Sequence, residues 1–305
     1  MKIRILLITA LTLPLILVLF GCKGDGALPS NSNTALPFED ELEGEPEVLN
    51  ENNGNNLDSK PITEKNDNNN RKEADVFIQL DEVNNNWLQS FNQGQGEVND
   101  LYLEKAILLP EKYDPIKGNN EISSYYKNNY QKMSDIIEIY VNGRIIESAT
   151  LVYEIGLFTT DNKNEYHYVV IWKKTNNGWL RELEMIGEDI PNQADSKEID
   201  KSRTDWMSFC NAHNSKVLVE ELYTTNAFYY NQGRLLHGSD EISSEYSYMN
   251  SGGYSLALEP MIVKVVQPDL AYEIGKCSGS YGGHYILRWE KEPDCKWKVS
   301  LDSNY

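Results

Sequence analysis

Apolar residues recur at two different spacings after residue 76, and the change from one spacing to the other happens twice. From Phe77 to Phe91, and again from Ile199 to Cys210, they return every three or four positions, which predicts one helix at the start of each half. Later in each half apolar and polar residues alternate, which predicts strands. The predicted strands are 135–141, 147–159, 165–174 and 178–186 in the first half, and 254–266, 269–277, 284–291 and 296–302 in the second.

Turn-forming residues separate these strands, including the dipeptide Asn142-Gly143 and the stretch SGSYGG at 278–283. Helices that come first and a meander of strands that follows predict an α+β fold. In such a fold the N-terminal helices pack on one face of a strongly curved antiparallel sheet.

The sequence Tyr-Glu-Ile-Gly occurs at 153–156 and again at 272–275, and it belongs to a longer internal repeat. Matched segments keep an offset of 117 to 121 residues and the same order. They are Trp87 and Trp206, DLYLEKAILL (100–109) and ELYTTNAFYY (221–230), GNNEISSYY (118–126) and GSDEISSEY (238–246), HYVVIWKK (167–174) and HYILRWEK (284–291), and Trp179 and Trp297. This regularity predicts two tandem copies of one domain, 76–187 and 198–305, joined by the linker 188–197.

Taken together, these motifs resemble the SnoaL-like branch of the nuclear transport factor 2-like superfamily. The resemblance rests on the helical Trp, the Leu-Tyr pair before a strand, the Gly-x-x-x-Ile before a further helix, Tyr-Glu-Ile-Gly and His-Tyr-x-x-x-Trp-x-Lys. It implies two tandem cone-shaped domains, with any pocket between sheet and helices. Open sheets in this superfamily often pair between subunits, so the two domains are expected to pair within the chain as a pseudo-dimer. Two independent domains are the alternative.

Several polar and aromatic residues at repeated strand positions are candidates for the lining of such a pocket. Alternation places Glu154 and Glu273 on the same strand face as the glycine of their motif. Each glutamate is expected either to line a pocket or to be solvated or ion-paired, and Arg288 is the candidate partner of Glu273. The pocket candidates are Tyr140, Glu154, His167, Tyr168, Tyr272, Glu273, His284 and Tyr285.

Known catalytic members of the superfamily carry an Asp or a Tyr–Asp pair in the cone, and this sequence offers no repeated strand Asp. Asp135, Asp269 and Asp302 are predicted at strand edges or ends. Phosphate-binding, zinc-protease, redox-thiol and serine-hydrolase motifs are absent from the sequence, so no metal or cofactor is expected.

The sequence therefore favours a non-enzymatic binding protein, whose cones bind a small apolar or aromatic ligand or another envelope protein. The alternative is an isomerase-, cyclase- or hydrolase-type enzyme that acts in the second domain. If the protein is an enzyme, Glu273, His284 and Arg288 are the expected catalytic residues.

The N-terminus predicts export and lipid attachment. Lys2 and Arg4 precede an apolar stretch from Ile5 to Phe20, which is short for a membrane span and typical of a secretory signal peptide over residues 1–21. Gly21-Cys22 at its end resembles the lipobox of bacterial lipoproteins, which implies acylation of Cys22, a lipid bilayer as partner and a location on the extracytoplasmic side of the bacterial cell envelope. An ordinary signal peptide and an uncleaved anchor are the alternatives.

Residues 22–75 have the composition of a disordered tether. EDELEGEPE at 39–47 contains six carboxylates, and eleven Asn fall between 31 and 70. So little apolar surface cannot offset the chain entropy lost on folding. The net charge of −19 for the whole chain also argues against nucleic acid as a partner.

The cysteines other than Cys22 all lie in the second repeat: Cys210, Cys277 and Cys295. Cys277 and Cys295 flank one predicted strand and would lie about 20 Å apart, which is too far for a disulfide. A pair between Cys210 on a helix and Cys277 on the sheet remains open, as do free thiols.

Overall fold

The computed structural model describes residues 63–190 and 195–305, with side chains from residue 71 onward, and these residues belong to one compact unit, Ser59–Tyr305. The first domain, termed cone 1, contains α1 (Thr63–Gln93), η1 (Asn99–Leu101), β1 (Tyr102–Pro110), β2 (Ile116–Lys117), α2 (Asn119–Met133), β3 (Ile136–Ser148), β4 (Leu151–Thr160), β5 (Glu165–Thr175) and β6 (Gly178–Glu188). The second, termed cone 2, contains α3 (Lys197–Asn211), α4 (Ser215–Leu222), β7 (Tyr223–Asn231), β8 (Arg234–His237), α5 (Ser239–Glu245), η2 (Tyr246–Asn250), β9 (Leu256–Gln267), β10 (Leu270–Gly279), β11 (Gly283–Lys291) and β12 (Trp297–Asn304).

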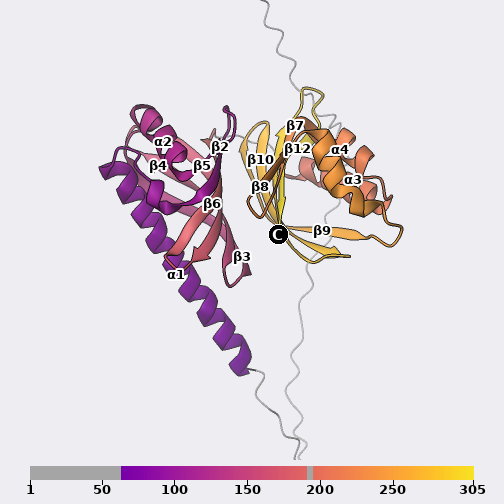
Figure 1. Ribbon diagram of the computed structural model, residues 1–305, viewed down its shortest axis with the longest axis horizontal. Coiled ribbons are helices and arrows are strands. Elements are labelled where there is room, and N and C mark those ends of the chain that lie inside the picture. Colours follow the sequence, from indigo (N-terminus) through magenta and orange to yellow (C-terminus); the bar gives the residue numbers. More distant parts are fainter. Residues whose placement is uncertain (1–62, 191–194) are drawn as a thin grey trace, which may run out of the picture. The chain divides into compact units, whose positions relative to one another are not determined.

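Both cones contain a curved six-stranded sheet with the same strand order (Figure 1). The order is β2-β1-β6-β5-β4-β3 in cone 1 and β8-β7-β12-β11-β10-β9 in cone 2. The last four strands of each sheet form the predicted antiparallel meander. However, β1 lies parallel to β6 and β7 lies parallel to β12, so the sheets are mixed rather than purely antiparallel. The predicted α+β class, with helices on one face of a strongly curved sheet in each of two domains, is confirmed.

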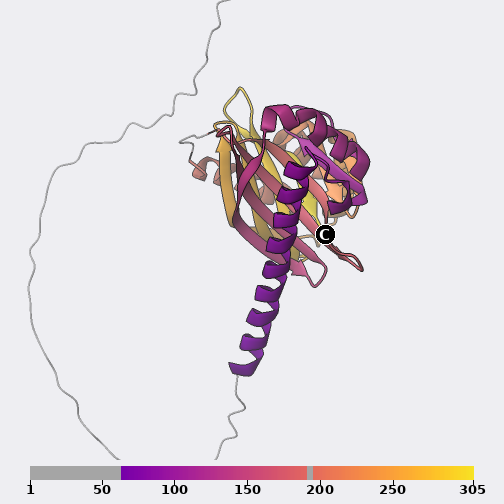
Figure 2. The same cartoon turned by 90° about the vertical axis from the view of Figure 1, so that its left-hand side faces the viewer.

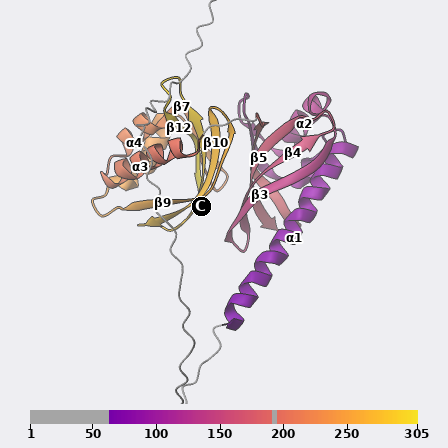
Figure 3. The same cartoon turned by 180° about the vertical axis from the view of Figure 1, so that it is seen from behind.

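The helices of each cone cover one sheet face, as the views from the front and from behind show (Figures 1 and 3). In cone 1, Val152, Tyr168 and Trp172 belong to the buried cluster beneath α1 and α2. Their strand neighbours Tyr153 and Ile171 belong to a different cluster on the opposite face. Successive side chains of a strand therefore enter two different apolar clusters, one on each face of the sheet. Both faces of these sheets are buried.

The faces that point away from the helices contribute to one shared apolar cluster. It contains side chains from both sheets: Ile107, Leu109, Leu151, Tyr153, Ile155, Val169, Ile171, Leu183, Met185, Tyr230, Val266, Leu270, Tyr272, Ile274, Ile286 and Leu301. All of these are less than 5% exposed. Burial on both faces explains why β4, β5, β10 and β11 have long, nearly continuous apolar runs.

The repeated Tyr-Glu-Ile-Gly motif is explained by a ring that crosses its glycine. Gly275 lies directly opposite Tyr285 in the β10–β11 register, and Gly156 lies opposite Tyr168. Each tyrosine ring lies over the glycine. Its hydroxyl donates a hydrogen bond to the Glu of the same motif, from Tyr285 to Glu273 and from Tyr168 to Glu154. A Cβ at either glycine would overlap this tyrosine and a carbonyl oxygen of the next strand. The motif therefore needs Gly at its last position for close approach.

Replacing Gly275 by alanine should lower the free energy of unfolding by about 2 kcal/mol, because the Tyr285 ring must leave its position and its hydrogen bond to Glu273. Urea unfolding followed by tryptophan fluorescence measures this change. Gly252→Ala is the matched control, since an added Cβ there meets no atom within 4 Å. Equal midpoints for the two variants would contradict the explanation.

The structure departs furthest from the prediction at two places. Asn142-Gly143 is not a turn: it lies inside β3, where the register with β4 shifts, so the dipeptide forms a bulge in one continuous strand. Helix α1 begins at Thr63, so residues 63–75, predicted as the end of the disordered tether, are helical and extend beyond the sheet (Figure 2). The predicted signal peptide, Cys22 and the rest of the tether up to residue 62 lie outside the described residues.

Among the helices of the described chain, none combines the length and apolar composition needed to cross a bilayer.

Candidate ligand-binding site

Cone 2 contains a cavity of about 420 Å³ between its helices and its sheet, termed the cone 2 cavity. Its lining is mainly aromatic and apolar. The lining residues are Trp206, Tyr229, Asn231, Glu245, Tyr248, Met249, Tyr254, Leu256, Leu258, Cys277, Tyr281, Gly282, Tyr285, Asn304 and Tyr305.

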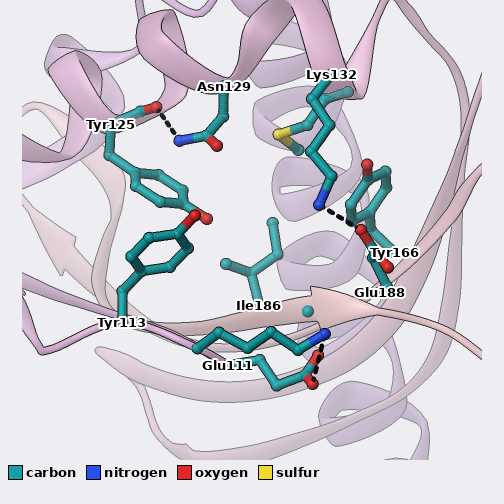
Figure 4. Close-up of a pocket in the computed structure, with 11 residues that line it drawn as sticks. Glu111, Tyr113, Tyr125, Asn129, Lys132, Tyr166, Ile186 and Glu188 are labelled. Carbon is teal, nitrogen blue, oxygen red and sulfur yellow. Dashed lines mark hydrogen bonds and ion pairs between the residues drawn. The ribbon is translucent and has the colours of Figure 1, made fainter. Parts of the chain in front are cut away.

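At the corresponding mouth of cone 1 the cavity measures only about 60 Å³ (Figure 4). Tyr113 and Tyr125 face each other across it with ring centroids 5.8 Å apart. Lys132 reaches across to Glu188, with 2.5 Å between Nζ and Oε1. This mouth is shallow because aromatic side chains occupy the space beneath it.

Three aromatic residues fill cone 1 where cone 2 has small residues. Phe158 and Tyr166 face each other in the β4–β5 register and stack at 5.2 Å. The equivalent pair in the β10–β11 register is Cys277 and Gly283.

The third aromatic residue lies on a helix. Phe91 stacks on Trp87 at 5.5 Å in cone 1. At the repeat offset of 119 residues cone 2 has Cys210 beside Trp206. Replacement of three rings by two thiols and a glycine opens the cone 2 cavity.

The two motif glutamates are fully buried on the helix side of the sheets, and each is paired with an arginine. Glu154 accepts from Arg144 Nε at 2.5 Å, Asn84 Nδ2 at 2.8 Å and Tyr168 Oη at 3.0 Å. Burying a carboxylate requires such partners, since an unpaired charge in this environment is costly.

Glu273 has a different arginine from the one proposed from sequence. Its two oxygens accept from Arg203 Nε and Nη2, each at 2.7 Å, and it also accepts from Tyr285 and Trp289. Arg288 is not its partner: Arg288 lies on the opposite face of β11 and bonds Ser300 and Glu290. Burial would lower the pKa of Arg203, but the hydrogen bonds and charge of Glu273 outweigh this effect and raise it.

A second buried carboxylate lies deep in each cone, and here the cones differ. In cone 1, Glu184 pairs with Arg181 at 2.5 Å and accepts from Tyr102 and Tyr126. In cone 2, Asp302 accepts from Tyr223 and Tyr246 through Oδ2.

The environment of Asp302 leaves its charge uncompensated. Burial raises the pKa of Asp302 to about 6. No Lys or Arg of the described chain pairs with Asp302, and Oδ1 has no partner at normal hydrogen-bond geometry there, although the backbone amide of Ser303 favours the charged form. Asp302 was predicted at a strand edge or end; it lies within β12 and is fully buried.

The structure separates the other predicted pocket residues. Tyr168 and Tyr285 point into their cones. His167 and Tyr272 lie on the opposite sheet faces, with ring centroids 5.1 Å apart, and Tyr140 is 45% exposed on β3. These last three therefore do not line a cone.

The proposed catalytic set does not converge. Glu273 points beneath the helices of cone 2, whereas His284 and Arg288 alternate onto the other face of β11 with Ile286. The ring Nδ1 of His284 instead lies 2.6 Å from Glu147 Oε2. The distance across the sheet prevents these three side chains from sharing one substrate.

The cysteines of the cone 2 cavity region are free thiols. Cys210 and Cys277 do not pair; Cys210 Sγ lies 3.5 Å from Met249 Sδ. Burial raises the pKa of Cys210 to about 12, which makes it a poor nucleophile. Cys277 lines the cavity, and burial raises its pKa as well. Cys295 lies in an exposed turn.

Sequence analysis missed the residues that distinguish the two cones, although the repeat contained the signal. In the alignment of the two repeats, Phe158 corresponds to Cys277, Tyr166 to Gly283 and Phe91 to Cys210. A comparison of side-chain size between the copies would have located the cavity. Among the described residues, no cluster of three or more His, Cys, Asp or Glu side chains is arranged to hold a metal ion.

Comparison with solved structures finds matches of low sequence identity, each to a part of this chain. An NTF-2 like protein of unknown function from Shewanella oneidensis matches 35% of this chain and 96% of its own, at 17% identity and a TM-score of 0.32. A ketosteroid isomerase-like protein from Erwinia carotovora atroseptica matches 36% of this chain and 94% of its own, at 15% identity and a TM-score of 0.30. An NTF2-like protein with a cystatin-like fold from Novosphingobium aromaticivorans matches 44% and 94%, at 9% identity and a TM-score of 0.33.

No family model and no curated protein sequence matches the chain. The structural neighbours reported above are NTF2-like and ketosteroid isomerase-like proteins.

Proposed function

We propose that the protein is a binding protein whose second cone holds a small, largely apolar or aromatic molecule, and that its first cone is structural. The observation that carries this proposal is the difference between the cones: about 420 Å³ of aromatic-lined cavity in one and about 60 Å³ in the other, on the same strand order. The lining combines aromatic faces with tyrosine hydroxyls and the polar side chains of Asn231, Glu245 and Asn304, which suits an apolar or aromatic body with a polar group.

The proposal includes attachment to a membrane. A basic start, the apolar stretch from Ile5 to Phe20 and Gly21-Cys22 support an acylated Cys22 on the extracytoplasmic side of a bacterial membrane. Two acyl signals suffice for stable anchoring. An acidic, Asn-rich segment between Cys22 and the first cone would keep the binding domain away from the bilayer surface.

Pairing of the two cones within one chain is the third part of the proposal. The apolar cluster to which both sheets contribute supports it, because a lone cone would expose that face. Such a chain should be monomeric in size-exclusion chromatography with light scattering. A stable dimer of whole chains would contradict this part.

A second candidate function is a proton-transfer enzyme of the isomerase or cyclase type in cone 2. The observation that favours it is Asp302, a buried carboxylate whose pKa burial raises to about 6, next to two tyrosine hydroxyls. Asp302 does not line the cone 2 cavity, however, and the proposed set Glu273, His284 and Arg288 is divided between two faces. Binding without turnover is therefore the first choice.

The test fills the cavity with the side chain that cone 1 uses. Wild-type protein should show a rise of a few degrees in its unfolding temperature with at least one member of a panel of steroids, fatty acids and aromatic compounds. Cys277→Phe restores the residue found at the equivalent position of cone 1, so it should fold and lose this rise. Met261→Phe is the control, because Met261 is 50% exposed on β9.

A panel that leaves wild type unchanged, or a Cys277→Phe variant that responds like wild type, would contradict binding in the cone 2 cavity. If the wild type turns over a panel compound and Asp302→Asn does not, the enzyme is favoured over the binding protein.

A further inference from the structure

The buried charges of the two cones do not balance in the same way. The interior of cone 1 holds two carboxylates, Glu154 and Glu184, and two guanidinium groups, Arg144 and Arg181. Among the described residues, the interior of cone 2 holds two carboxylates, Glu273 and Asp302, and one guanidinium group, that of Arg203. Cone 2 therefore has one cation fewer for the same number of acidic groups.

The missing cation is the equivalent of Arg181. In cone 1, Arg181 lies opposite Tyr102 in the β6–β1 register; in cone 2, Val299 lies opposite Tyr223 in the β12–β7 register. The Arg181 guanidinium carbon lies 4.3 Å from the Trp87 ring centroid and 5.1 Å from that of Trp172. Cone 1 thus holds a built-in organic cation between aromatic rings and a carboxylate.

Cone 2 keeps the residues that surround this cation. At the repeat offsets Trp206 replaces Trp87, Trp289 replaces Trp172, and Asp302 replaces Glu184. These three side chains are buried, and Asp302 Oδ1 has no partner at normal hydrogen-bond geometry in the described part of the chain. A buried carboxylate oxygen without a partner calls for a positive charge or a donor nearby.

The cone 2 cavity adjoins this region. Trp206 and Tyr285 line it, and so does Tyr229, which lies opposite Asp302 in the β7–β12 register. None of the lining residues is Lys, Arg or His, whereas Glu245 lies at the cavity with its carboxylate 2.6 Å from Arg234. Because Arg234 neutralises Glu245, the cavity offers aromatic faces, and the carboxylate near it without a cationic partner among the described residues is Asp302.

We propose that the ligand of cone 2 is an organic cation, an ammonium group on an apolar or aromatic body, held against the aromatic wall on the Asp302 side of the cavity. This inference rests on the proposed binding function and names the chemical class of its ligand. The cation supplies from the cavity the positive charge that the Arg181 guanidinium supplies within cone 1.

A pair of probes equal in shape and different in charge tests the inference. N,N,N-trimethylanilinium and tert-butylbenzene are titrated into the full chain at pH 7.5, where Asp302 is mainly ionised, and affinities are measured by calorimetry. The wild type should bind the cation about ten-fold or more tighter than the neutral isostere. Asp302→Asn should remove this preference, whereas Glu259→Gln, a charge change at an exposed position of β9, should leave it.

The outcomes separate the two proposals. Equal affinity of wild type for both probes overturns the cation inference and leaves cavity binding intact. Binding of neither probe, together with a response to neutral members of the panel, also overturns it. The wild-type comparison does not depend on whether Asp302→Asn folds, and a cation preference that survives in a folded Asp302→Asn protein contradicts the role of this carboxylate.

Discussion

Replacing Arg181 by valine, the residue that cone 2 has at the same position, should lower the free energy of unfolding by about 3–5 kcal/mol. Arg181 is 2% exposed and donates to Glu184 Oε1 at 2.5 Å and to Asn84 Oδ1 at 3.2 Å. Without it the fully buried Glu184 loses its counter-charge, and the rings of Trp87 and Trp172 face a void. Burial would lower the pKa of Arg181, but Glu184 raises it, so the guanidinium stays charged.

Arg234→Val is the matched control for this change. Arg234 forms an ion pair of 2.6 Å with Glu245, but its side chain is 56% exposed, so its loss should lower stability far less than the loss of Arg181. Urea unfolding of both variants gives the comparison. The double variant Arg181→Val, Glu184→Gln should recover part of the loss, because no unpaired charge then remains buried. Equal costs for Arg181→Val and Arg234→Val would show that the cone 1 cation is dispensable.

Local pattern was sufficient to predict the fold, because the repeat made every signal appear twice. Alternation in Tyr-Glu-Ile-Gly correctly separated Tyr153 from Glu154, and the helical spacing around Trp87 and Trp206 correctly marked α1 and α3. The mixed character of the sheets was missed, because parallel pairing of β1 with β6 joins residues about eighty positions apart. No local periodicity carries that information.

The partners of the buried acids could not be predicted for the same reason. Arg203 reaches Glu273 from a helix seventy residues earlier. The pairing of Arg181 with Glu184 also needs a shift of register between Ile171 and Trp172 against β6, since strict alternation would place the two side chains on opposite faces. Asp302 was assigned to a strand end because the predicted strand stopped at residue 302, whereas β12 continues to Asn304.

Acid should destabilise the protein through His167. This residue was predicted to line a pocket, but it is buried on the sheet face away from the helices, where its ring contacts Tyr272. Burial lowers the pKa of His167 from 6.5 to about 3, with a smaller contribution from the charge of Arg288. Between pH 6.5 and pH 3 the unfolded chain therefore binds a proton that the folded chain does not, and stability falls as the pH falls. By pH 4.5 the loss from this residue should reach about 2–3 kcal/mol relative to pH 7.5.

His167→Asn removes the titrating group, so the variant should lose less stability than wild type between pH 7.5 and pH 4.5, even if it starts from a lower value. Urea midpoints at the two pH values measure the difference. His237→Asn is the matched control, because it makes the same substitution at an exposed histidine on β8. An acid sensitivity that is the same in His167→Asn and in wild type would mean that His167 is protonated in the folded protein, and that the face between the sheets admits a charge.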